Sequence, residues 1–155
     1  MAEQGITADI DCYLLPAKPL PVVLPLECVA EVIAKPDIEP AETGSANWMV
    51  GHTTWQNQRL PVMSFDALND SNAKIKGRRK AHLVVLNPVP SAARKSYAAW
   101  LCFGNIERLT VGHSALMAEI PEQLDRRYVD AVVRINKIEA VVPKLAAISV
   151  AFSYF

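Results

Sequence analysis

The pattern of apolar and polar positions predicts a mainly β chain with a hairpin at its centre. Two runs rich in aromatic, β-branched and other apolar residues, 48–55 and 59–65, flank a polar trio, which is typical of a β-hairpin. Asn57, within that trio, is expected to adopt the left-handed backbone conformation because its short side-chain amide can bond the local backbone. Gly51 indicates a bulge or a close backbone approach, and Pro61 favours an edge or bulged strand.

Before this hairpin, the pattern predicts two short strands and a helix. Residues 10–15 and 21–24 are expected to be strands joined by a proline-containing turn. The stretch PLECVAEVIAKP, from Pro25 to Pro36, has the strongest helical pattern of the chain, since its apolar residues recur at helical spacing and a proline stands at each end. A connecting loop is expected over residues 36–46.

The second half of the chain shows the same kind of pattern of apolar runs and turns as the first. We expect a buried strand at 81–86, its antiparallel partner at 97–103 and a short helix or turn at 106–111. After these we expect a helical turn at 120–127, a hairpin of 130–135 and 139–142 about Asn136 and Lys137, and a helix at 145–148. This order implies two small β-barrel lobes with few helices. We expect one domain over residues 10–155 after a flexible lead at 1–9, with a lobe crossover near 69–80 and a shared core.

Composition and charge narrow the class of protein. The chain has 155 residues, 51% of them apolar, and a mean hydropathy of +0.13, which excludes disorder for most of its length. Sixteen basic residues balance sixteen acidic ones, so no net field draws the molecule toward nucleic acid or a membrane. The sequence lacks an apolar run of about 18 residues and a secretion signal. A cytoplasmic protein without direct membrane insertion is expected.

The residues that could carry chemistry do not form a recognisable catalytic or metal site. Cys12, Cys28 and Cys102 stand apart among apolar neighbours and are expected to be buried thiols. The histidines are likewise isolated, and His52 beside Thr54 is the single polar cluster that suggests a nucleophile and its base. We therefore expect a binding module with no catalytic residue, metal or cofactor, and keep an enzyme with a site at His52 as an alternative.

The basic loop from Lys74 to Lys80 leaves a second alternative open. It contains five basic residues, and such a run can bind phosphate. It lacks interleaved aromatic residues on which bases could stack, which favours a solvated loop and no nucleic-acid partner. A small β-barrel that binds nucleic acid through this loop remains the alternative function.

Several motifs resemble the CheW-like family of chemotaxis coupling proteins, mainly over residues 10–68. The matching pieces are Leu24-Pro25, VAEV at 29–32, PDIEP at 36–40, WMVG at 48–51 and LPV at 60–62. The chain differs at the hairpin tip, where it has Thr54-Trp55-Gln56-Asn57 in place of the family's Asn-x-Arg-Gly. Asp130-Ala131 also replaces a glycine in the second lobe. It is similar in this to divergent accessory members of the ChpC type, which belong to pilus-linked chemosensory systems.

The resemblance implies a fold and a function. The fold would be two SH3-like five-stranded β-barrels with a groove between them. The function would be that of a non-catalytic adaptor that docks the cytoplasmic tip of a chemoreceptor, the regulatory domain of a chemotaxis-type histidine kinase, or other CheW-like proteins. By position, the partner contacts would be Val29, Glu31, Val32, Gly51 and Gln56.

Two of these positions also have a purely structural interpretation. Val29 would then pack in the core, and Gly51 would serve a backbone bulge. Trp48 and Trp55 are expected to be half-buried, and either could be an exposed anchor. Gln56 lacks the charge and the planar fork of the family's arginine.

Overall fold

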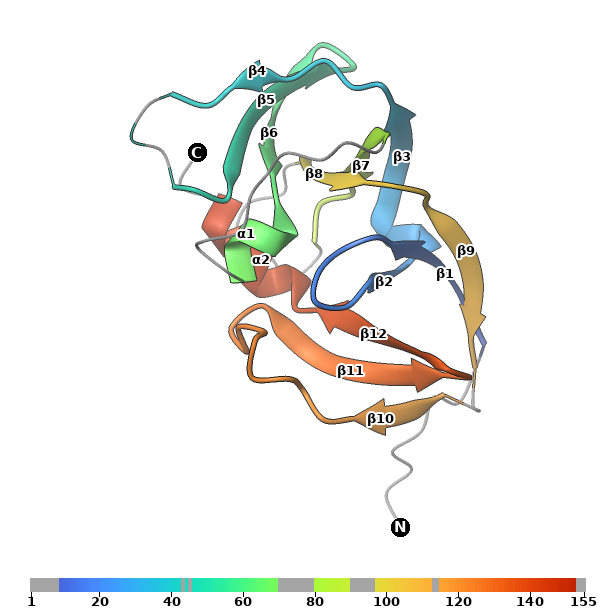
Figure 1. Cartoon of the computed structure of the whole chain (residues 1–155). Helices are drawn as coiled ribbons and strands as arrows, with labels where there is room; N and C mark the ends of the chain where they lie inside the picture. The colour runs from blue at the N-terminus through green and yellow to red at the C-terminus, as the bar shows by residue number, and fades with distance from the viewer. Residues whose placement is uncertain are drawn as a thin grey trace.

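The computed structural model describes residues 9–42, 44, 46–69, 80–89, 97–112 and 115–152. Within these residues the chain forms two six-stranded sheets, and we call them lobe A and lobe B. Figure 1 shows lobe B above lobe A, with two short helices beside their junction. The predicted fold class, mainly β in two lobes with few helices, is confirmed. Each sheet has six described strands, one more than the resemblance implies.

Lobe A combines strands from both ends of the chain. In sheet order its strands are β10 (Leu116–Ala118), β11 (Val129–Ile135), β12 (Ile138–Pro143), β2 (Val22–Pro25), β1 (Ile10–Leu15) and β9 (Glu107–Val111). All neighbours are antiparallel except β12 and β2, which pair in parallel at Val141 and Val22.

Lobe B is built from the middle of the chain. In sheet order its strands are β3 (Val29–Ala34), β7 (Ala81–Leu86), β8 (Ala98–Phe103), β6 (Gln58–Met63), β5 (Met49–Trp55) and β4 (Glu39–Pro40). Again one pair is parallel, β6 with β8 at Val62 and Ala99. The remaining described elements are the 3₁₀ turn η1 (Leu26–Cys28), α1 (Phe65–Asn69) and α2 (Leu145–Phe152).

The two halves of the chain, β1 to α1 and β7 to α2, have the same order of elements and the same pairings. The hairpins β5–β6 and β11–β12 share a bulge, after Met49 in one and after Val129 in the other. Helices α1 and α2 begin at Phe65 and Leu145. Each of these pairs lies 80 positions apart in sequence. The repeat predicted from the sequence is therefore present in the backbone, and each described strand of one lobe has an equivalent strand in the other.

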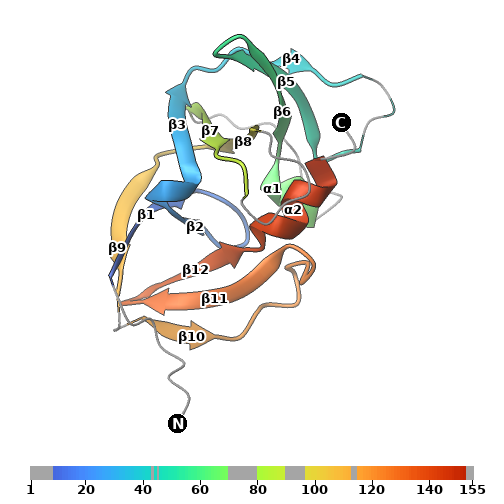
Figure 2. The ribbon, with the colours of Figure 1, turned by 180° about the vertical axis from the view of Figure 1, so that it is seen from behind.

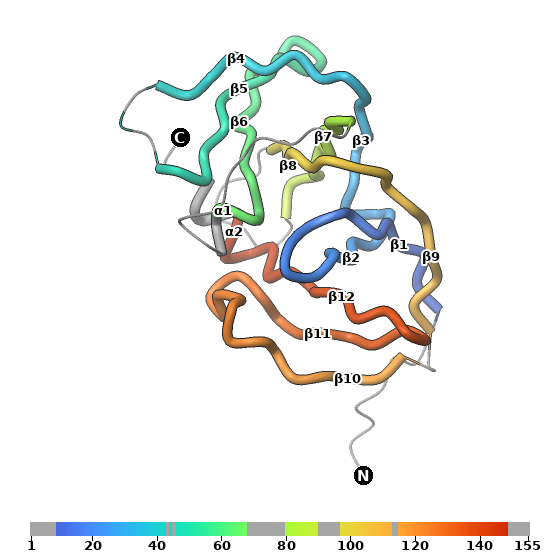
Figure 3. Tube along the Cα trace, viewed as in Figure 1, coloured from blue at the N-terminus to red at the C-terminus, as the bar shows by residue number. Residues whose placement is uncertain are grey.

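The halves exchange their first two strands. Strands β1 and β2 join lobe A, whereas the rest of their half forms lobe B; β7 and β8 do the reverse. The tube in Figure 3 follows the chain as it changes lobe at η1 and again between β8 and β9. The sequence predicts a crossover at 69–80, and residues 70–79 of this stretch lie outside the described part. Local patterns do not encode such an exchange.

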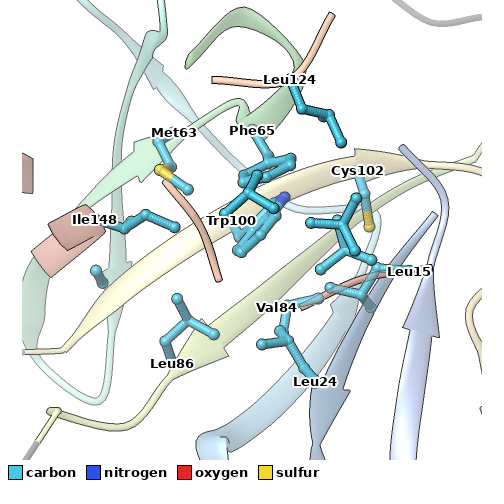
Figure 4. Packing of buried hydrophobic residues seen from close by; sticks show 14 of the residues in the cluster. Leu15, Leu24, Met63, Phe65, Val84, Leu86, Trp100, Cys102, Leu124 and Ile148 are labelled. Atoms are coloured by element: carbon cyan, nitrogen blue, oxygen red, sulfur yellow. The ribbon is translucent and has the colours of Figure 1, made fainter. Parts of the chain in front are cut away.

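One apolar core is shared by both lobes, as predicted. It joins side chains of both sheets and both helices, and Phe65 of α1 stacks on Trp100 of β8 with ring centroids 4.7 Å apart. Figure 4 shows this stack among Leu15, Leu24 and Ile148. Figure 2 shows α1 and α2 from behind, at the junction of the lobes. Burial of these apolar side chains, at about 25 cal/mol per Å², holds the two sheets together.

The helix predicted between Pro25 and Pro36 is wrong. This stretch forms the short turn η1 and then strand β3, which pairs with β7. The physical reason is a bulge between Val29 and Glu31. A bulge inserts one residue and so restarts the alternation of faces. Val29 and Val32 consequently share a face at a spacing of three, which resembles the spacing along a helix.

Other elements differ in smaller ways. Residues 107–111 are strand β9, where the sequence predicts a short helix or turn, and residues 120–127 form turns without a helix. The short strands β4 and β10 were not predicted. The strands at 10–15, 81–86 and 97–103, both hairpins and the helix that begins at Leu145 are confirmed to within a few residues.

Pro61 lies on an interior strand, so the edge position favoured from the sequence is wrong. It faces His52 on β5, three positions from the turn-flanking pair Trp55 and Gln58. That pair is hydrogen-bonded in a two-residue hairpin, and alternation makes the Pro61 pair a non-hydrogen-bonded one. The proline nitrogen therefore points toward β8, whose pairing with β6 begins only at Val62. The missing N–H costs no ladder bond.

Candidate functional site

The structure brings Glu31 and the central hairpin together. The Trp55 indole Nε1–H donates a hydrogen bond of 2.8 Å to Glu31 Oε1. Trp55 is buried with 8% of its surface exposed, and its ring contacts Tyr97 with centroids 4.9 Å apart. Glu31 itself lies at the surface of β3. A surface carboxylate thus fixes a buried aromatic side chain next to the exposed hairpin tip.

The hairpin tip is a two-residue turn. Gln56 and Asn57 have φ of +48° and +62°, and positive φ at both central residues is the signature of a type I′ turn. The left-handed Asn57 predicted from the sequence is confirmed. Gln56 is exposed beside Trp55, so its amide is available to a partner.

Val29 and Val32 lie together on the other face of β3. Their cross-strand partners are Leu86 and Val84, which belong to the shared core. Val29 packs against that core, and Val32 is partly exposed. Glu31 instead faces Trp55. The bulge therefore divides the predicted contact residues between an apolar face with Val29 and Val32 and a polar edge with Glu31 and Gln56.

Gly51 is buried under strand β4. Its φ is +157°, and a Cβ at this position would collide with the backbone carbonyl oxygen of Glu39. It follows the bulge that begins at Met49. Both sequence-based expectations for this glycine, a bulge and a close backbone approach, are confirmed. Since Gly51 is covered by the chain's own backbone, a direct contact with a partner does not explain it.

A polar pocket of about 270 Å³ opens where β3 turns toward β4. Thr53 Oγ1 donates a hydrogen bond of 2.8 Å to the Asp37 carbonyl, and Arg59 forms an exposed ion pair of 3.2 Å with Glu39. His52 lines the same pocket, and burial, aided by the Arg59 charge, lowers its pKa. The pocket mixes both signs of charge and contains no recognisable catalytic pair.

The cysteines are free thiols. Burial raises the pKa of Cys12 to about 11 and that of Cys102 to about 12, so both are protonated near neutral pH. Burial also raises the pKa of the half-buried Cys28. Among the described residues, no three His, Cys, Asp or Glu side chains gather in a way that could hold a metal ion. None of the helices in the described part is long and apolar enough to cross a membrane.

Sequence reasoning missed Tyr97 and misjudged the tryptophans. Tyr97 precedes β8 and closes the end of lobe B against Trp55. Trp55 is buried rather than half-buried, whereas Trp48 is partly buried against the shared core, as expected. The alternation within β5 places Trp55 on the same side as the buried Thr53, and that signal was available in the sequence. Of the basic loop, residues 74–79 lie outside the described part.

Comparison with known proteins places the fold. No protein family model matches the chain, and no curated protein matches it. The crystal structure of the scaffolding protein TtCheW from Thermoanaerobacter tengcongensis is similar, with a TM-score of 0.70 and 12% identity over 87% of this chain and 88% of that one. The chain therefore has the CheW fold of two β lobes. The resemblance noted in the motifs and the likeness of the backbones point to the same fold.

Proposed function

We propose that this protein is a non-catalytic adaptor of a chemosensory signalling system. It docks the cytoplasmic tip of a chemoreceptor, the regulatory domain of a histidine kinase, or another CheW-like protein. The observation that supports the proposal best is the structural likeness, over 87% of this chain, to a protein described as a scaffold. The CheW-like motifs at Leu24-Pro25, 29–32 and 60–62 support the same assignment.

The docking surface in this proposal is β3 with the neighbouring hairpin tip. Val32 supplies partly exposed apolar surface next to the junction of the lobes, and Gln56 supplies an exposed amide. Glu31 acts through Trp55, whose hydrogen bond holds the tip in place. An apolar centre with a polar rim is the usual composition of a protein interface. Val29 packs against the shared core beneath this surface, whereas Gly51 lies against the backbone of β4.

The tip also supports assignment to an accessory, pilus-linked class. Gln56 carries no charge where the resembling family has an arginine, so a partner carboxylate that pairs with that arginine would lose a bidentate contact here. The proposal therefore extends to a divergent adaptor of the ChpC type with a role in pilus-driven motility. Its partner set would differ from that of the principal coupling protein.

Affinity capture tests the proposed function. Tagged wild type is used to retain proteins from its native lysate, at moderate salt with nuclease present, beside Val32→Glu. Arg108→Glu is the matched control, because Arg108 occupies in β9 the place that Val32 occupies in β3. We expect wild type and Arg108→Glu to retain a chemoreceptor or a chemosensory kinase and Val32→Glu to lose it. Retention of neither by wild type, or equal retention by Val32→Glu, would overturn the proposal.

A further inference from the structure

The outer edges of the two sheets differ although they occupy equivalent places. Strand β4 ends lobe B and consists of Glu39 and Pro40. Charge and proline are two of the devices by which proteins prevent pairing at a sheet edge. Strand β10 ends lobe A and carries neither. Its Leu116 and Met117 are 62% and 64% exposed, the highest values among the exposed large apolar residues of the described part.

The hydrogen-bonding groups of β10 that pair with no described strand can be assigned from the register. In the hairpin β11–β12 the turn-flanking pair is Ile135 and Ile138, so Arg134 directs its N–H and C=O toward β10. Leu116 faces Arg134, and Met117 faces Val133. The N–H and C=O of Met117 therefore point away from the sheet. Figure 3 shows β10 at the outer rim of lobe A.

We propose that β10 pairs antiparallel with β10 of a second copy of this chain, about a two-fold axis at Met117. Antiparallel pairing of a strand with its own copy is self-complementary, as a two-fold interface requires. Strand β10 has no charged side chain, and the whole chain has a net charge of zero, so no repulsion opposes the contact. The pair would join two lobe A sheets and bury Leu116 and Met117 of both copies.

The register predicts a specific disruptive substitution. Proline at position 117 removes an N–H that points outward and leaves the hydrogen bonds between β10 and β11 in place. Pro40 shows that the equivalent edge, strand β4 of lobe B, tolerates a proline whose nitrogen points outward. It lies next to Glu39, the residue that faces His52. Met117→Lys is a second variant, which keeps the N–H and places two like charges at the axis. Ile138→Ser is the control, because Ile138 is 43% exposed but lies on the interior strand β12.

Sedimentation equilibrium over a concentration series tests the proposal. The full chain is expected to reach twice its mass of 17.0 kDa reversibly. Met117→Pro and Met117→Lys should weaken this dimer by about tenfold or more, and Ile138→Ser by less than about twofold. In wild type the exchange of the Met117 amide proton should slow as the mass rises. A monomer at all concentrations, loss of the dimer in Ile138→Ser alone, or an exchange rate at Met117 that is independent of concentration would overturn the proposal.

Discussion

Glu31 and Trp55 are joined by a hydrogen bond of 2.8 Å between a surface carboxylate and a buried indole. The two residues belong to β3 and β5, which lie at separate places in the sheet order of lobe B. The bond therefore fastens the edge strand of the lobe to its central hairpin. It connects the surface that carries Glu31 and Gln56 to the side chains packed inside the barrel of lobe B.

Loss of this carboxylate should destabilise the protein. Glu31→Ala leaves the Trp55 N–H buried and unpaired, which costs about 1–3 kcal/mol in the free energy of unfolding. Urea denaturation followed by tryptophan fluorescence measures the change. Glu31→Gln keeps an acceptor and should lose less. Glu27→Ala, which removes an exposed acid from η1, is the control and should stay within about 0.5 kcal/mol of wild type. Equal stabilities of Glu31→Ala and wild type would contradict the prediction.

Gly51 should not tolerate a side chain. Gly51→Ala places a Cβ against the Glu39 carbonyl at a φ of +157°, so we expect a loss of roughly 1–3 kcal/mol in stability. The equivalent position in lobe A is Ala131, which already carries a Cβ. Ala131→Gly should cost only about 0.5–1 kcal/mol. Thermal unfolding of both variants checks the contrast, and a Gly51→Ala protein as stable as wild type would refute the backbone role.

A replacement of the turn residue Gln56 should raise the stability of the protein. Left-handed backbone costs an ordinary residue about 1–2 kcal/mol, and asparagine visits it more readily. Gln56→Asn is therefore expected to raise the free energy of unfolding by roughly 0.5–1 kcal/mol at its φ of +48°. Gln58→Asn provides the comparison, because Gln58 lies in β6 and gains nothing from a turn-forming residue. A stabilisation by Gln58→Asn but not by Gln56→Asn would contradict this interpretation of the turn.

The buried thiols should make the free energy of unfolding depend on pH in the alkaline range. Burial raises the pKa of Cys102 to about 12 from 9.0. Above pH 9 the unfolded chain releases this proton and the folded chain keeps it, so the free energy of unfolding falls as pH rises from 9 toward 12, by up to about 1.4 kcal/mol per unit.

Cys102→Ala removes this contribution. Denaturant titrations at pH 8 and pH 11 measure it against wild type, whose other groups provide the common background. The stability lost by the variant at pH 8 should shrink at pH 11. A difference between the two proteins that is the same at both pH values would show that the thiol ionises alike in the folded and unfolded chains.

Local patterns predicted those elements whose signals are local. The central hairpin followed from two apolar runs about Asn57, and the strand at 81–86 from a continuous apolar run. Strand β3 was mistaken for a helix because its bulge spaces Val29 and Val32 three residues apart. The exchange of strand pairs between the halves was not predicted, because it depends on long-range pairing, which no local pattern records.

The candidate site was predicted in part for the same reason. Motif positions gave the predicted contact residues, but not which of them share a face. Gly51 was assigned a partner contact, although its backbone conformation and the nearby Glu39 carbonyl explain it. The bond from Trp55 to Glu31 joins residues 24 positions apart in sequence, and only the closed barrel brings them together.

The most direct test of the central claim is the affinity of the chain for the regulatory domain of the kinase recovered by capture. Calorimetric titration of the purified proteins at about 50 and about 200 mM salt gives the Kd of wild type, Val32→Glu and Arg108→Glu. An adaptor that docks through β3 should bind with a Kd that changes little with salt. It should weaken by about tenfold or more in Val32→Glu alone. Binding that Val32→Glu leaves intact, or no binding by wild type, would contradict the account.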